Sequence, residues 1–295
     1  VNMSNAKVLA NLETIKSITL ANKIKFWQDV MVYASERGID CYVFTWNTFT
    51  YGTENSGYGF TKAVTDSKTK DYFRKATKAL ITTYPLLKGL GVTAGENMSG
   101  NVADNESFLY GSYGMGINDA LEANSNRTFR LIHRAHQVKV STIKAAFAGL
   151  NSRCSLEYSF KYAKAHIYSS VAPDYIYKEK FLNDIGSSRF FLTLRDDDWY
   201  YLRGGSDPGF VRNYLKKIPY NNLSGFYIGP DGYTWGREYI SKAPASPNQL
   251  VLDKRWYSCL LWGQLAYDPN LPDSLFKNIL AARFPNVNSQ NLYTA

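Results

Sequence analysis

Apolar and polar residues alternate along this chain in two periods, one helical and one extended. A helical pattern with apolar residues three and four positions apart runs from Phe73 to Tyr84, and Pro85 ends it. The next stretch, Gly89–Asn97, is a short apolar run between glycines that ends in a carboxylate and an amide. A helix, a break, a buried strand and a polar strand end together predict one repeat of an α/β fold.

The same alternation recurs over the length of the chain. Six segments have the β-favouring pattern of strands: 39–47, 89–96, 128–133, 156–165, 189–194 and 225–229. The segments between and around them predict helices at about 6–36, 73–84, 108–121, 138–150, 173–185, 210–217, 249–265 and 273–284. Strict alternation implies parallel strands, and strands that all end in polar residues favour a (β/α)8 TIM barrel.

A TIM barrel needs eight strands, and this sequence supplies six. Because the chain opens on a helical segment, we expect the first two strands to lie upstream of Val1. No long linker divides the 295 residues, so a single incomplete barrel domain is predicted over residues 1–295. A Rossmann-type sheet is the competing architecture, but no G-x-G-x-x-G sequence follows any predicted strand.

Composition narrows the class of partner. Aromatic residues make up 15% of the chain, and their flat faces can pack on sugar rings as well as in a core. The net charge of +9 favours an anionic partner, yet Lys and Arg are scattered, which favours an acidic small molecule or an acidic polysaccharide over nucleic acid. No apolar run approaches the length of a membrane span. The three cysteines are far apart in apolar contexts, so we expect buried thiols and no metal site or disulfide framework.

Polar and aromatic side chains gather at the predicted strand ends, which share one rim in a barrel. The residues expected to bind substrate there are Trp46, Asn47, Asn97, His133, Arg134, Lys161, His166, Arg195, Tyr233 and Trp235. The aromatic members can stack on sugar rings, and the cations can bind a substrate carboxylate or sulfate. Core packing and pairing with local aspartates are the alternative uses of these side chains.

Paired carboxylates at such a rim are the chemistry of glycosidic bond cleavage. Glu96 follows an apolar strand without a charged neighbour in sequence, which suits a general acid with a raised pKa. Asp197, within the run Arg195–Asp198, and Asp231 are the candidates for the second carboxylate. The alternatives are a structural salt bridge for Glu96 and a turn-forming role for Asp231.

The three histidines follow predicted strand ends and permit a second chemistry. His133, His136 and His166 with Asp231 are residue types that ligate metals in barrel hydrolases. Hydrogen bonding to sugar hydroxyls is the more economical use, so no metal and no cofactor are expected.

Several short motifs resemble one group of known proteins. They are Phe44–Asn47, Gly91–Met98, Leu131–Arg134, Phe160–Tyr162, Asp231–Glu238 and Trp262–Gly263. In these motifs the chain resembles bacterial (β/α)8 glycoside hydrolase-like proteins from polysaccharide-degrading systems, and most nearly the α-glucuronidase type. The resemblance implies an acid Glu after the fourth strand, which is Glu96 if two strands precede Val1. It also implies a Glu nucleophile after the seventh strand, where this chain has Arg195–Asp198, and this departure leaves an inverting mechanism open.

We therefore expect a secreted or periplasmic glycoside hydrolase that acts on an acidic or neutral polysaccharide. No nucleic-acid or membrane partner is expected. A non-catalytic carbohydrate-binding barrel and a metal-dependent hydrolase that uses the histidines are the two alternatives.

Overall fold

The computed structural model describes residues 17–45, 57–94, 98, 100–135, 138–160, 183–195, 207–217, 221–229 and 251–294. The chain divides into two compact units. The first comprises Val1–Lys161 and Phe181–Phe190, and the second comprises Tyr162–Lys180 and Phe191–Ala295. The single domain predicted over residues 1–295 stays a prediction.

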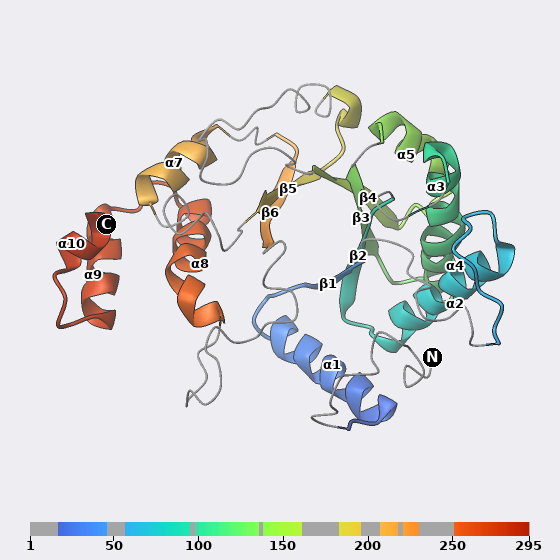
Figure 1. Ribbon diagram of the computed structural model, residues 1–295, viewed down its shortest axis with the longest axis horizontal. Helices are drawn as coiled ribbons and strands as arrows, with labels where there is room; N and C mark the ends of the chain where they lie inside the picture. Colours follow the sequence, from blue (N-terminus) through green and yellow to red (C-terminus); the bar gives the residue numbers. More distant parts are fainter. Residues whose placement is uncertain are drawn as a thin grey trace. The chain divides into compact units, whose positions relative to one another are not determined.

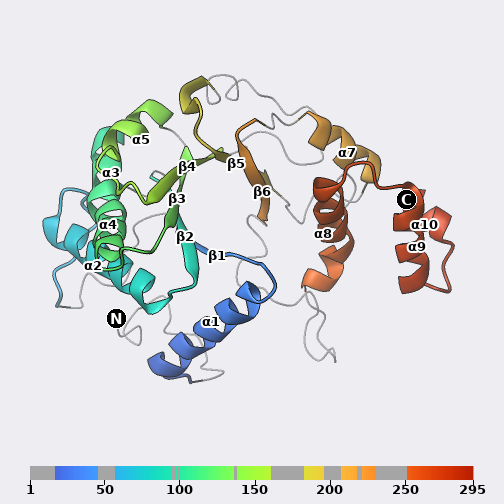
Figure 2. The same cartoon turned by 180° about the vertical axis from the view of Figure 1, so that it is seen from behind.

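The first unit is an α/β unit built on four consecutive strands. They are β1 (Cys41–Phe44), β2 (Leu87–Val92), β3 (Phe129–Ala135) and β4 (Cys154–Phe160). Its helices are α1 (Leu20–Ser35), α2 (Ser67–Thr83), α3 (Val102–Leu109), the π-helix η3 (Tyr110–Gly114), α4 (Met115–Glu122) and α5 (Val140–Ala146). In Figures 1 and 2 the helices α2 to α5 gather along one side of β2, β3 and β4.

The four strands pair in parallel and in chain order. The register places Phe44 opposite Gly91, Val92 opposite His133, and Ala135 opposite Phe160. The segments that leave these strands therefore start from one common edge of the sheet, the carboxyl edge.

Capping residues fix where three helices of the first unit begin. Asp66 accepts hydrogen bonds from the backbone N–H groups of Lys68 and Thr69 at the start of α2. Asn101 accepts one from Asp104 at the start of α3, and Thr19 accepts one from Asn22 at the start of α1. Each cap satisfies backbone donors that have no partner inside the helix.

Two glycines in β2 make room for aromatic rings on β1. A Cβ atom at Gly89 would lie 2.8 Å from the ring of Tyr42, and one at Gly91 would overlap the ring of Phe44. The glycines therefore let two aromatic side chains cross the neighbouring strand, which explains why the apolar run of β2 is interrupted.

In its described residues, the second unit contains two strands and four helices. Its strands are β5 (Phe190–Arg195), of which Phe190 belongs to the first unit, and β6 (Leu223–Gly229). Its helices are α7 (Pro208–Lys216), α8 (Val251–Tyr267), α9 (Asp273–Arg283) and α10 (Ser289–Thr294). The buried Trp262 on α8 packs edge-on against Tyr214 of α7 and Phe226 of β6, with ring centroids 5.5 Å apart in each pair.

The described elements confirm the alternation of strands and helices expected from the pattern of apolar residues. The six strands lie within three residues of the predicted positions, except that β2 ends four residues earlier, at Val92, and β4 ends five residues earlier, at Phe160. This succession of strands and helices is that of part of a TIM-barrel-like fold. No helix in the described ranges is both long and apolar enough to cross a membrane.

Candidate active site

The carboxyl edge of β1–β4 is the candidate active site of the first unit, because loops at this edge carry the chemistry of parallel α/β folds. The chain leaves β1 after Phe44 and β2 after Val92. Thr45 extends the ladder by donating its N–H to the Gly91 carbonyl at 2.8 Å, and its side chain is hydrogen-bonded to the buried Tyr113. These contacts fix the point at which the loop after β1 begins.

Most of the predicted site residues lie outside the described residues. Glu96 falls four residues beyond the end of β2, and its role as general acid stays a prediction. The others outside the described residues are Trp46, Asn47, Asn97, His136, Lys161, His166, Asp197, Asp231, Tyr233 and Trp235. Their predicted roles stay predictions as well.

The segment between Glu96 and α3 is held at its far end by one amide side chain. Asn105 Nδ2 donates to the Gly100 carbonyl at 2.9 Å, and the Gly100 N–H donates to Asn105 Oδ1 at 3.1 Å. A Cβ atom at Gly100 would lie 2.5 Å from the Val64 side chain, so the loops that follow β1 and β2 are in contact there. The two loops are thus packed together on the carboxyl-edge side of the first unit.

His133 lies inside the first unit and pairs with an acidic residue of the helix layer. His133 and Glu106 of α3 are both 0% exposed, and His133 Nε2 lies 2.7 Å from Glu106 Oε2. The imidazole packs edge-on against Phe147, with ring centroids 5.5 Å apart. Among the described residues, Glu106 Oε1 and His133 Nδ1 have no hydrogen-bond partner.

This position differs from the strand end at which the sequence placed His133. Strand β3 continues two residues further, to Ala135, and the alternation of side chains turns His133 toward α3. The described geometry is that of a buried polar pair, and contact between His133 and a substrate stays a prediction.

Arg134 and Arg195 are the other two predicted site residues that fall in described strands. Arg134 follows His133 on β3 and is half-buried, and its carbonyl accepts a hydrogen bond of 3.3 Å from Thr93 Oγ1. Thr93 and Arg134 therefore join the carboxyl ends of β2 and β3. Arg195 is the last residue of β5, in the second unit.

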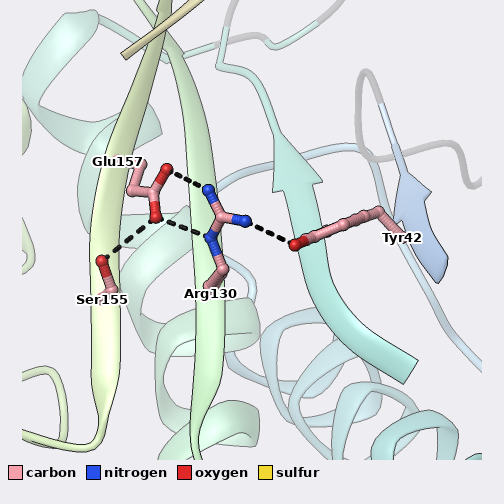
Figure 3. Close-up of polar contacts among 4 residues, drawn as sticks. All are labelled: Tyr42, Arg130, Ser155 and Glu157. Carbon is pink, nitrogen blue, oxygen red and sulfur yellow. Dashed lines mark hydrogen bonds and ion pairs between the residues drawn. The ribbon is translucent and has the colours of Figure 1, made fainter. Parts of the chain in front are cut away.

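A second polar cluster lies on the other side of β3, and Figure 3 shows its four residues. Arg130 Nε and Nη2 donate to the two carboxylate oxygens of Glu157, each at 2.6 Å. Arg130 Nη1 donates to the Tyr42 hydroxyl at 2.5 Å, and Ser155 Oγ donates to Glu157 Oε1 at 3.3 Å. The cluster therefore joins β1, β3 and β4 by side chains, across the strand β2.

Electrostatics explains why Glu157 can be buried. Its side chain is 2% exposed and that of Arg130 is 28% exposed, so the carboxylate sits in the interior while the guanidinium reaches the solvent boundary. The two-pronged hydrogen bonding to Glu157 raises the pKa of Arg130. The Glu157 carboxylate on β4 is thus bound to the Arg130 guanidinium on β3, so the cluster is suited to holding the sheet together.

Sequence reasoning missed Arg130, Glu157 and Glu106. For Glu157 a signal was present, because Ser155, Glu157 and Ser159 alternate with apolar residues in the strand, and such a pattern gives one polar and one apolar face. The pairing with Arg130 could not be found in this way, since the two residues are 27 positions apart. The described residues contain no group of three or more His, Cys, Asp or Glu side chains placed to hold a metal ion.

Comparison with known proteins gives a fold but not a family. No protein-family model and no curated protein matches the chain. Among solved structures, the chain is similar to a GH138 enzyme targeting pectin rhamnogalacturonan II, with a TM-score of 0.77 and 18% identity over 97% of this chain. The chain spans only 35% of that enzyme's length.

Two further structures are less similar. One is a thermostable mutant of a xylanase from Cellvibrio japonicus, with a TM-score of 0.41 and 10% identity, over 89% of this chain and 87% of the xylanase. The other is a sugar phosphate isomerase/epimerase from Parabacteroides distasonis, with a TM-score of 0.37 and 11% identity, over 80% of this chain and 90% of that protein. The similarity to the GH138 enzyme is a likeness of fold alone.

Proposed function

We propose that the chain belongs to a glycoside hydrolase that cleaves an acidic or neutral polysaccharide. The observation that carries the proposal is the similarity of fold, at a TM-score of 0.77 over 97% of the chain, to an enzyme that targets a pectin. The motifs that resemble the α-glucuronidase type support the finer assignment to acidic sugars. A secreted or periplasmic location is proposed with it, because polysaccharides of this kind lie outside the cell.

Glu96 is the proposed general acid, and Asp231 or Asp197 supplies the second carboxylate. Hydrolysis of a glycosidic bond needs one carboxyl group to protonate the leaving oxygen and another to attack or to activate water. The support for Glu96 is its place in the chain, four residues beyond the described end of β2, in a loop that starts from the carboxyl edge. The aromatic and cationic residues predicted at the strand ends are proposed to bind the sugars.

The substitution Glu96→Gln tests the proposal, because it removes the proton and keeps the size of the side chain. We expect turnover of the cleaved polysaccharide to fall at least about 100-fold, the usual contribution of a general acid. Glu122→Gln is the matched control, since Glu122 is an exposed glutamate on α4. The purified variants are compared on a panel of pectic and neutral polysaccharides and aryl glycosides.

The outcomes separate the proposed enzyme from its alternatives. Undiminished turnover by Glu96→Gln would remove Glu96 from the mechanism. If the wild-type protein binds a glycan tightly but forms no product from any substrate of the panel, the chain is a carbohydrate-binding barrel and not an enzyme.

A further inference from the structure

One continuous helix carries two buried side chains to the ends of two strands. It consists of α3, η3 and α4, which follow one another without a break, and we name it the α3–α4 helix. Glu106 reaches His133 of β3, and Tyr113 reaches Thr45, the residue that follows β1. Glu106 and Tyr113 lie seven positions apart, about two turns of an α-helix, so both leave the helix on the side of the sheet.

The contact of Glu106 lies at the level where the chain leaves β2. In the register of the sheet, His133 is opposite Val92, the last residue of β2. Glu106 Oε2 lies 2.7 Å from His133 Nε2, and both side chains are fully buried. The contact therefore ties α3 to the carboxyl end of the sheet.

The segment 93–100, which carries the proposed general acid, is anchored at both ends. At its start, Thr93 Oγ1 donates to the Arg134 carbonyl of β3 at 3.3 Å. At its end, the backbone of Gly100 exchanges two hydrogen bonds with the side chain of Asn105 on α3. The place of α3 on β3 therefore decides how far apart the two ends of the segment lie.

The pair of Glu106 and His133 is a poor source of stability. Among the described residues, Glu106 Oε1 and His133 Nδ1 have no hydrogen-bond partner, and each buried atom of this kind costs free energy. Two apolar side chains of similar volume would pack without that cost. A hydrogen bond, however, fixes the distance and the direction between two elements. The pair is thus better suited to fixing the position of α3 than to stabilising the fold.

A π-helical turn holds the second contact. Tyr113 lies in η3, where Ser112 Oγ donates to the Phe108 carbonyl at 2.6 Å. The ring of Tyr113 packs against Phe73 of α2, with centroids 5.9 Å apart, and its hydroxyl is hydrogen-bonded to the Thr45 side chain. Turns of this kind inside α-helices frequently lie at functional sites. The loop that starts at Thr45 carries two of the residues predicted to bind the sugar.

We propose that the α3–α4 helix is the positioning element of the proposed active site. Through Glu106 and His133 it holds the segment with the general acid, and through Tyr113 it holds the loop with the sugar-binding residues. These three side chains are positioning residues, which act through the two loops. The proposal deepens the proposed function and rests on it for the catalytic role of Glu96.

The first test compares kcat and KM for the cleaved polysaccharide. The double variant Glu106→Leu with His133→Leu replaces the polar pair by apolar side chains. We expect its kcat to fall about 10- to 100-fold with KM within about 2-fold, because a misplaced general acid affects the transition state more than substrate binding. Glu106→Gln keeps a hydrogen-bonding side chain of the same size and should retain kcat within about 3-fold. Urea denaturation establishes that each variant is folded.

Tyr113→Phe tests the second contact, because it removes one hydroxyl and keeps the ring. We expect KM to rise about 2- to 10-fold, the worth of one hydrogen bond, with a smaller change in kcat. Tyr110→Phe is the matched control, since Tyr110 lies in the same π-helical turn and packs against Phe147. It should change neither constant.

Hydrogen exchange gives a readout that needs no catalysis. The Gly100 N–H donates to Asn105 Oδ1, and its exchange, followed by NMR, should be at least about 5-fold faster in the double variant. Asn118→Leu is the control for a general loss of stability, since the Asn118 side chain binds the backbone of Gly149 and Asn151 ahead of β4. It should leave kcat and the exchange of the Gly100 N–H unchanged.

Three results would overturn the positioning element: a wild-type kcat in the double variant, equal effects of Tyr113→Phe and Tyr110→Phe on KM, or unchanged exchange of the Gly100 N–H in the double variant. The two proposals fail separately. Faster exchange of that N–H in a protein that cleaves no polysaccharide would retain the positioning element and remove the enzyme. Hydrolysis that is lost in Glu96→Gln but kept in the double variant would do the reverse.

Discussion

Two buried glutamates lie on opposite sides of β3 and are compensated in different ways. Glu157 receives two hydrogen bonds from the guanidinium of Arg130 and a third from Ser155. Glu106 shares one hydrogen bond with His133, and its Oε1 has no partner among the described residues. The first cluster is a charged pair that is well satisfied, and the second is a polar pair with one unmatched atom on each residue.

The difference teaches how much a buried polar group depends on its partner. Removing one member of a well-formed ion pair leaves an uncompensated charge, which costs more than the pair itself contributes. A pair with unmatched atoms already carries part of that cost in the folded protein. The cluster around Glu157 should therefore be the more sensitive to single substitutions, and the pair of Glu106 and His133 should be the easier to replace by apolar residues.

The largest effect is expected for Arg130→Met, which leaves the Glu157 carboxylate buried without its cation. We expect the free energy of unfolding to fall by about 3 kcal/mol, measured by urea denaturation. The double variant Arg130→Met with Glu157→Leu should recover most of this loss, because no charge is then buried. If the double variant is as unstable as the single one, packing and not charge explains the role of Arg130.

A smaller effect is expected on the other side of β3. Glu106→Leu removes the partner of His133 Nε2 and should lower the free energy of unfolding by about 2 kcal/mol. The double variant Glu106→Leu with His133→Leu should be close to the wild type or more stable, since it also removes the two unmatched atoms. Urea denaturation again gives the measurement, and a double variant that is less stable than Glu106→Leu would contradict this view of the pair.

The smallest effect is expected for an ion pair with the same geometry whose side chains are both partly exposed. Arg74 Nε and Nη2 donate to the two carboxylate oxygens of Asp119, each at 2.7 Å, but this pair lies nearer the solvent than Arg130 and Glu157. Arg74→Met should cost about 0.5 kcal/mol at pH 7, as for exposed pairs. A loss as large as that of Arg130→Met would show that burial does not decide the difference.

The stability that the ion pair of Arg74 and Asp119 contributes changes with pH in a definite direction. Hydrogen bonding to Arg74 lowers the pKa of Asp119 below its ordinary value of 3.8. The stability contributed by the pair is therefore present above about pH 4 and is lost as the pH falls through the lowered pKa. At a pH below the lowered pKa of Asp119, the midpoint temperatures of thermal unfolding of the wild type and of Arg74→Met should converge.

The sequence predicted the order of elements well and the charged contacts poorly. Strands β3, β5 and β6 lie within two residues of the β-favouring segments, β4 ends five residues before the predicted end, and the alternation with helices holds in the described residues. His133 was placed at a strand end because the predicted strand stopped two residues before Ala135, where β3 ends. Boundaries of this kind depend on hydrogen bonds to the neighbouring strand, which a local pattern does not contain.

The chain by itself determined where apolar runs form strands and helices, because hydrophobic periodicity and capping residues act within a few positions of one another. It also determined the supply of aromatic and cationic side chains. The tertiary structure alone decided which of them meet. Arg130 contacts Glu157, which is 27 residues away in the sequence, and Tyr42, which is 88 residues away. Glu106 contacts His133, which is 27 residues away. Such contacts depend on strand register and on the face to which each side chain turns, and these are properties of the packed sheet.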